Sequence, residues 1–114
     1  MSRLSPTIPA SWRRAPGGYA VGEGERPWVL IPGIRGDPAE FARLVPLLDG
    51  PVRILATATL GGPGGEPDTL AEYAWRALDV LPPGPLRVIG ASFGGLVGMA
   101  MPPSLNVFAG TKAG

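Results

Sequence analysis

The stretch Leu86-Arg87-Val88-Ile89-Gly90-Ala91-Ser92-Phe93-Gly94-Gly95 decides what fold the chain can adopt. The apolar run 86–89 predicts a buried strand, and the glycines that follow predict a sharp turn into a helix over 93–101. Ser92 then stands at the apex of a strand–turn–helix, which is the layout of a nucleophile elbow. The alternative interpretation is a glycine-rich turn with an incidental serine, since Gly-x-Ser-x-Gly alone is a weak motif.

A second motif lies earlier in the chain. The continuous apolar run Trp28-Val29-Leu30-Ile31 predicts a strand buried on both faces, and Pro32-Gly33-Ile34-Arg35-Gly36 ends it. Acyl transfer needs two backbone N–H groups that stabilise a tetrahedral oxyanion. In this arrangement Phe93, the residue after Ser92, supplies one N–H group, and Ile34 supplies the other. An ordinary Pro-Gly turn that closes a strand is the alternative.

The rest of the chain alternates predicted strands and helices. The sequence Asp37-Pro38-Ala39-Glu40 predicts a capped helix start, and Pro46 should kink or end that helix. A second helix is expected to start at Thr69, with Glu72 as its capping partner. Its apolar stripe is Leu70, Tyr73, Ala74, Ala77, Leu78 and Leu81.

Shorter apolar runs predict strands at 19–21, 52–55 and 105–108, and Gly61–Gly65 predicts a flexible loop. Strand and helix thus follow each other three times, which implies right-handed crossovers. The fold class that this order predicts is α/β, a parallel β-sheet with flanking helices.

Composition sets the class of protein. The formal net charge is +1 with no basic block or acidic tail, so it gives no argument for nucleic acid or an anionic membrane as a partner. There is no cysteine, and the N-terminus lacks the apolar segment of an export signal, so we expect a cytoplasmic protein. Residues 1–18, rich in Pro, Ser, Arg and Gly, predict a flexible arm before a single domain over 19–114.

From Tyr19 to Met101 the pattern resembles the N-terminal half of the α/β-hydrolase superfamily. The resemblance rests on Gly22-Glu23-Gly24, on the Pro-Gly-Ile-Arg-Gly-Asp loop and on Gly90–Gly95. The Pro-Gly form with Ser-Phe-Gly-Gly is similar to the thioesterase branch. The resemblance implies acyl hydrolysis of a small ester or thioester, with Ser92 as nucleophile and the N–H groups of Ile34 and Phe93 as oxyanion donors. It implies no cofactor and no metal.

The chain departs from that family after the serine. The family order is Ser, then Asp or Glu, then His, but no acidic residue follows Ser92 and the chain has no histidine. Without a base the hydroxyl is a poor nucleophile, so we expect negligible turnover from these 114 residues. The pattern predicts a partial domain, truncated after the elbow helix. Its strand 86–89 is then expected to be an apolar edge, covered only by the predicted strand 105–108 or open to pairing with a second copy.

Two hypotheses from other classes stay open. One is a non-catalytic binding or interaction module that keeps the fold without the chemistry. The other is a membrane-associated small protein, because no charged residue lies between Arg87 and Lys112 and Gly-x-x-x-Gly spacing occurs there. The adjacent prolines at 102 and 103 make that stretch a poor spanning helix.

Overall fold

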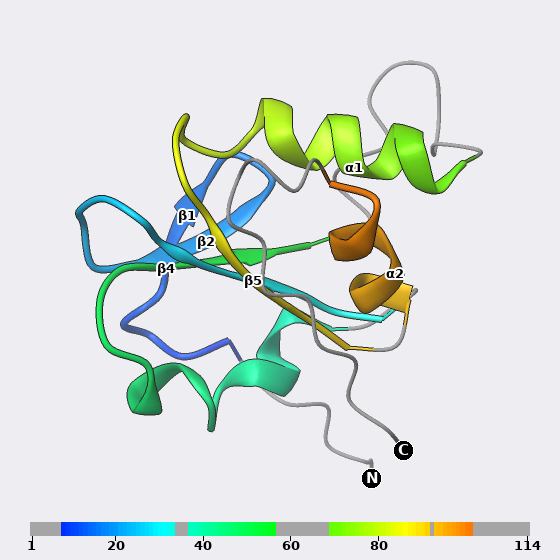
Figure 1. Ribbon diagram of the computed structural model, residues 1–114. Helices are drawn as coiled ribbons and strands as arrows, with labels where there is room; N and C mark the ends of the chain where they lie inside the picture. The colour runs from blue at the N-terminus through cyan, green and yellow to red at the C-terminus, as the bar shows by residue number, and fades with distance from the viewer. Residues whose placement is uncertain (1–7, 34–36, 57–68, 92, 102–114) are drawn as a thin grey trace, which may run out of the picture.

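A computed structural model describes residues 8–33, 37–56, 69–91 and 93–101, and in this part of the chain five strands form one sheet (Figure 1). The strands are β1 (Arg13–Ala15), β2 (Gly18–Val21), β3 (Trp28–Ile31), β4 (Val52–Leu55) and β5 (Arg87–Gly90). Their order across the sheet is β1-β2-β4-β3-β5. The strands predicted at 28–31 and 52–55 are therefore confirmed to the residue.

The sheet is mixed, and the prediction of a parallel sheet with flanking helices is wrong. The pairs β1–β2 and β2–β4 are antiparallel, and only β3–β4 and β3–β5 are parallel. The antiparallel part begins at a tight hairpin, in which Ala15 pairs with Gly18 across Pro16 and Gly17. A two-residue connection can join only antiparallel neighbours, whereas a parallel pair needs a long crossover.

The glycines of this hairpin bring it against the end of a helix. Gly17 has a φ of +79°, and an added Cβ would overlap the Cγ2 atom of Val80. At Gly18 an added Cβ would overlap the carbonyl oxygen of Ile54 in β4. A side chain at either position would therefore push the hairpin away from its neighbours.

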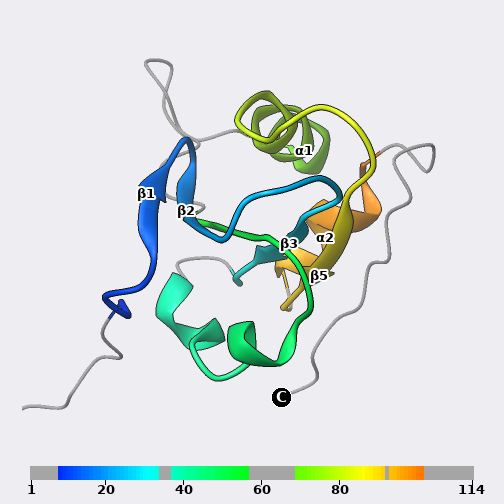
Figure 2. The same cartoon turned by 90° about the vertical axis from the view of Figure 1, so that its left-hand side faces the viewer.

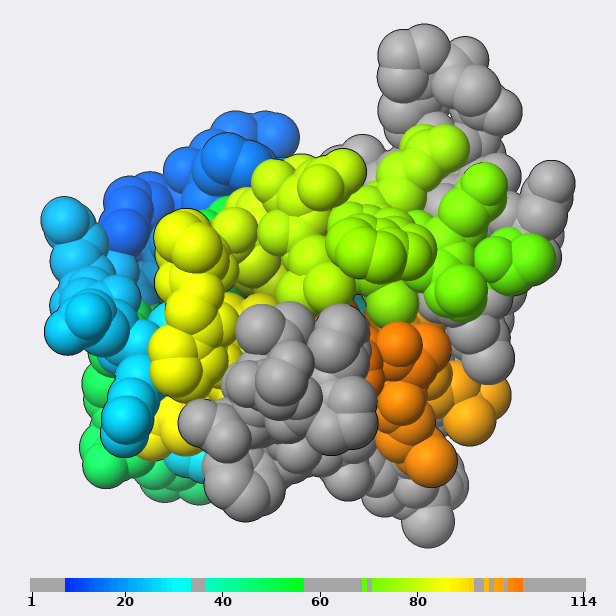
Figure 3. Space-filling view, turned by 45° about the horizontal axis from the view of Figure 1, so that its top comes forward, coloured from blue at the N-terminus to red at the C-terminus, as the bar shows by residue number. Residues whose placement is uncertain are grey.

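The helix α1 (Leu70–Asp79) begins where the capping residues predict. The Thr69 Oγ1 accepts a hydrogen bond from the backbone N–H of Glu72 at 3.1 Å. The predicted apolar stripe faces the sheet, since Tyr73, Ala74 and Ala77 are all buried. The helix α2 (Phe93–Met99) lies beside α1 (Figure 3), and both helices contribute to the core on the same face of the sheet.

The opposite face carries no α-helix among the described residues. The helix predicted after Asp37 is instead two 3₁₀ turns, η1 (Pro38–Phe41) and η2 (Val45–Leu47). Asp37 caps η1 as expected, because its Oδ1 accepts from the N–H of Ala39 at 2.9 Å. Pro46 lies inside η2 and lacks the N–H that an α-helix would need there, which explains why the turns stay short. Helices thus flank one face only, with the 3₁₀ turns beneath the other (Figure 2).

Alternate residues along the strands face opposite sides of the sheet, and each side has one hydrophobic core. Toward α1 and α2, the buried strand residues are Val29, Ile31, Leu55 and Val88. Toward the 3₁₀ turns, Leu30, Val52 and Ile54 pack with Phe41, Val45 and Trp12. β5 is the outermost described strand at its end of the sheet, and Val88 within it is fully buried. Pairing of β5 with a second copy stays a prediction.

Part of the predicted N-terminal arm belongs to the packed structure. Trp12 is buried, and residues 13–15 form β1. The ring of Trp12 lies 6.0 Å from that of Tyr19. Residues 1–7, the predicted loop Gly61–Gly65 and the predicted strand 105–108 lie outside the described residues. Within the described ranges, no helix is long and apolar enough to span a bilayer.

Candidate functional site

The strand–turn–helix predicted around Ser92 is present in the described residues on both of its sides. β5 ends at Gly90 and α2 begins at Phe93, so only Ala91 and Ser92 separate them. The N–H of Ala91 donates to the carbonyl of Ile31 at 2.9 Å, and the N–H of Gly94 donates back to the carbonyl of Ala91 at 2.9 Å. The first bond ties the end of β5 to the end of β3, and the second bond lies within the turn.

Gly94 is the residue that allows this close approach. It is buried, and an added Cβ would overlap the carbonyl oxygen of Ile31 and lie 2.6 Å from that of Pro32. Both atoms belong to backbone, which cannot rotate away as the end of a side chain can. Only glycine therefore lets the first turn of α2 sit on the end of β3.

The loop that follows β3 begins at the same place. Ile31 pairs with Gly90 in the parallel register, and Ile31 and Pro32 are fully buried beside the turn. Of the three predicted site residues, Phe93 lies in the described structure as the first residue of α2. Ser92 and Ile34 lie outside the described residues. The structure thus brings together the segments that flank Ser92 and Ile34, but it does not give the positions of those two residues.

The described elements that follow β3 and β5 in the sequence pack on opposite faces of the sheet. β3 leads toward η1 beneath the sheet, and β5 leads into α2 above it (Figure 2). Two adjacent parallel strands that are followed by elements on opposite faces have the arrangement of a topological switch point. The sequence could not show this, because it does not reveal that β3 and β5 are neighbours.

Asp37 is the first described residue after the loop that follows β3. The carboxylate of Asp37 is committed to capping η1. No group of three or more His, Cys, Asp or Glu side chains that could hold a metal ion occurs among the described residues. Predicted oxyanion chemistry here would rest on backbone N–H groups.

Arg53 in β4 is a positively charged group with a structural role. Its side chain donates to the carbonyls of Pro16 at 2.7 Å and Val80 at 2.9 Å, which ties the hairpin to the end of α1. The Nε atom is buried and has no hydrogen-bond partner among the described residues. Burial lowers the pKa of Arg53, and the nearby positive charge of Arg13 lowers it further.

A scan against protein-family models finds no match, and neither the curated proteins nor the solved structures include a chain that matches significantly.

Proposed function

We propose that this chain carries the nucleophile and oxyanion part of an acyl-hydrolase site, with a relationship to the N-terminal half of the α/β-hydrolase superfamily. Ser92 is the nucleophile, and the N–H groups of Phe93 and Ile34 face the developing oxyanion. The substrate class is a small ester or thioester. We place this chemistry in the cytoplasm, because the chain has no cysteine that an oxidising compartment would pair.

The observation that carries the proposal is the contact between Gly94 and the end of β3. An incidental serine in a glycine-rich turn would need no close approach at that glycine. Here the overlap of an added Cβ with the Ile31 carbonyl makes glycine obligatory two residues after Ser92. The hydrogen bond from Ala91 to the same carbonyl holds the other side of the serine. Ser92 is thus flanked by one hydrogen bond to the Ile31 carbonyl and by the close approach of Gly94 to the same carbonyl.

The proposed site lacks a general base. Ser92 needs a base to accept its hydroxyl proton, and the 114 residues contain no histidine. An oxyanion hole without a base retains only residual catalysis. We therefore expect the isolated chain to be acylated slowly and to turn over negligibly, until an imidazole is supplied from outside.

Chemical rescue with imidazole tests the proposal. The chain is incubated with p-nitrophenyl acetate with and without imidazole, and acetylation of each serine is measured by peptide mass spectrometry. Ser92 Oγ attacks the ester carbonyl carbon, imidazole accepts the hydroxyl proton, and p-nitrophenolate leaves. We expect Ser92 to be acetylated about 100-fold faster than Ser11, because one oxyanion donor contributes on that order. Ser11 is an exposed serine without the strand–turn–helix, and serves as the internal control.

The variants separate this proposal from a binding module of the same fold. Ser92→Ala should abolish the fast acetylation, whereas Ser11→Ala should leave it unchanged. Equal acetylation of Ser92 and Ser11 with imidazole present would reject the catalytic proposal and favour the non-catalytic module. Substantial hydrolysis without imidazole that depends on Ser92 would instead show that a base is present after all.

A further inference from the structure

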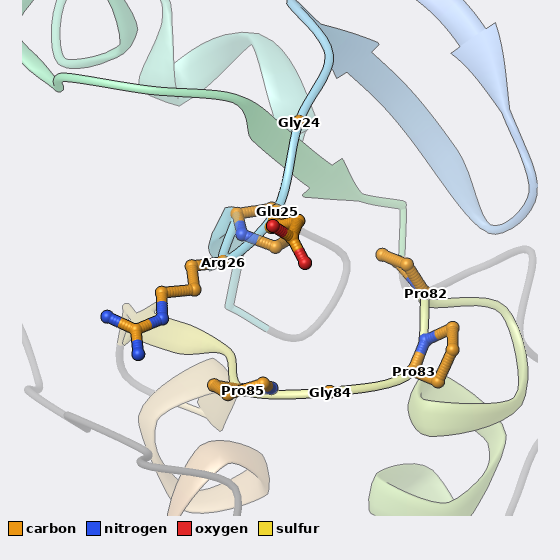
Figure 4. A pocket seen from close by; sticks show the side chains of 8 residues that line it. Gly24, Glu25, Arg26, Pro82, Pro83, Gly84 and Pro85 are labelled. Atoms are coloured by element: carbon orange, nitrogen blue, oxygen red, sulfur yellow. The ribbon is translucent and has the colours of Figure 1, made fainter.

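An open pocket of about 500 Å³ lies at the opposite end of the parallel strands (Figure 4). One wall leads into β3 and the other leads from α1 into β5. Its lining residues are Gly24, Glu25, Arg26, Pro27, Pro82, Pro83, Gly84 and Pro85. Small-molecule pockets commonly measure roughly 300–1,000 Å³ and combine apolar walls with a few placed polar groups.

The walls of this pocket are stiff, apolar and poor in hydrogen-bond donors. Four of the eight lining residues are prolines, and none of those four has a backbone N–H. Each of them still contributes a carbonyl acceptor. Because the proline backbone is fixed beforehand, a ligand pays little entropy to order these walls. The pocket therefore suits a ligand that brings donors of its own on an apolar stem.

The polar side chain directed into the pocket is that of Glu25. Figure 4 shows its carboxylate turned toward the space between the two walls, whereas the side chain of Arg26 extends away from it. Among the described residues, Glu25 has no ion-pair or hydrogen-bond partner. Arg26 also lines the pocket, but because its side chain extends away from the walls, the charged group turned toward the space between them is the Glu25 carboxylate.

The backbone at Arg26 is held in a conformation that fits this arrangement. Arg26 has a φ of +56°, in the left-handed region that non-glycine residues seldom occupy. The Arg87 side chain donates to the Arg26 carbonyl from Nε at 3.1 Å and from a terminal nitrogen at 2.9 Å, which stabilises that conformation. The positive charge of Arg87 is itself faced by the Asp49 carboxylate at 3.7 Å. Strained residues of this kind concentrate at ligand sites.

We propose that the pocket between Gly24–Pro27 and Pro82–Pro85 binds an organic cation, a primary ammonium or guanidinium group on an apolar stem. The cation pairs with the Glu25 carboxylate and donates to the carbonyls of the proline wall, while the stem packs on the proline rings. The site is separate from Ser92 and does not depend on the proposed hydrolase chemistry. A free amine and the side chain of a lysine in a peptide share this chemistry.

Titrations followed in ¹H–¹⁵N correlation spectra test the proposal. The probes are n-butylammonium chloride, N-acetyl-lysine amide and, as an uncharged compound with an apolar stem of similar length, n-pentanol. We expect the Gly24 and Gly84 amide resonances to shift in saturable fashion with an ammonium probe and much less with n-pentanol. Saturation with N-acetyl-lysine amide alone identifies a peptide side chain as the source of the cation. Saturation with n-butylammonium shows that a free amine suffices.

The variant Glu25→Gln and its control Glu23→Gln complete the test. Both residues are exposed, so neither substitution should disturb folding, and Glu23 does not line the pocket. Glu25→Gln should weaken ammonium binding about fivefold, the effect of losing a partly exposed ion pair. Glu23→Gln should leave the binding curve unchanged. The proposal is overturned if neither ammonium probe shifts Gly24 and Gly84, if n-pentanol acts equally, or if Glu25→Gln binds like the wild type.

Discussion

The contacts that hold the parallel strands together differ in kind between the two ends of these strands. At the carboxyl ends of β3 and β5, backbone packs directly on backbone, through the hydrogen bond from Ala91 to Ile31 and the close approach of the bare Cα of Gly94 to the Ile31 carbonyl. At the amino ends, the backbone N–H groups of Arg87 and Trp28 donate to the carbonyls of Pro27 and Pro51, and the Arg87 side chain adds a bridge from β5 to the segments before β3 and β4. The first end depends on the absence of a side chain, and the second depends on the presence of one.

This difference predicts how sensitive each end is to amino-acid substitution. A close-packed backbone contact has no soft degree of freedom, so a single added carbon must displace a strand or a helix. A guanidinium that bridges several carbonyls can lose one partner and keep the others. The carboxyl end, where the proposed nucleophile stands, should therefore be the more sensitive to small substitutions.

The substitution Gly94→Ala should have the largest effect. Helix propensity alone predicts that alanine stabilises a helical site by about 1 kcal/mol relative to glycine. Here the added Cβ overlaps the Ile31 carbonyl, so we expect the free energy of unfolding to fall by about 3 kcal/mol instead. Urea denaturation followed by circular dichroism measures the change.

Gly84→Ala is the matched control at the amino end. Gly84 has a φ of +106°, but nothing lies within 4 Å of an added Cβ there. Backbone strain alone should therefore cost about 1 kcal/mol. If Gly94→Ala proves neutral or stabilising, α2 does not rest on β3 as described and the argument for an obligatory glycine beside Ser92 fails.

The substitution Arg87→Ala should be the most damaging at the amino end. The guanidinium donates twice to Arg26, once to the Asp49 carbonyl at 3.3 Å, and lies 4.3 Å from the centre of the Trp28 ring. Losing these contacts should lower the free energy of unfolding by about 2 kcal/mol. The same urea titration reports it, and the Trp28 fluorescence should shift as the ring loses its cation.

Two further variants sharpen the Arg87 result. Arg87→Lys keeps the charge but lacks the planar fork that reaches two carbonyls, so it should recover less than half of the loss. Arg43→Ala removes an exposed arginine and should change stability by less than about 0.5 kcal/mol. Full recovery by lysine would mean that charge alone, and not bridging geometry, joins these segments.

The sequence predicts the parts of the fold that depend on neighbouring residues in the chain. β3, β4 and the start of α1 follow from continuous apolar runs and from the Thr69 cap, and the structure confirms them. The mixed sheet was missed because the hairpin at Pro16 and Gly17 lies in a stretch whose composition predicts a flexible arm. The 3₁₀ turns were missed because a capped start predicts where a helix begins but not how long it lasts.

In the candidate site too, features that depend on neighbouring residues could be predicted, and contacts between distant segments could not. The glycines around Ser92 indicate a tight turn, and the structure describes that turn on both of its sides. The atom that Gly94 approaches, the Ile31 carbonyl, could not be predicted, because it depends on which strand lies beside β5. The pocket lined by Glu25 was missed for a similar reason, since its two walls are more than fifty residues apart in the sequence.

The substitution Asp49→Asn should change the free energy of unfolding least. It tests whether Arg87 acts through its ion pair with the Asp49 carboxylate or through its hydrogen bonds to backbone carbonyls. The Asp49 carboxylate lies 3.7 Å from Arg87, and its side chain is 95% exposed. Exposed ion pairs contribute little, so the free energy of unfolding should change by less than about 0.5 kcal/mol and depend weakly on salt. The Asp49 backbone carbonyl, which accepts from Trp28 Nε1 at 3.0 Å and from Arg87, is unchanged by the substitution. In a double-mutant cycle with Arg87→Ala, the coupling should accordingly be close to zero. A coupling energy above about 1 kcal/mol would show that the Asp49–Arg87 ion pair, and not the hydrogen bonds from Arg87 to backbone carbonyls, stabilises the amino ends of the strands. The two ends would then differ because one depends on electrostatics.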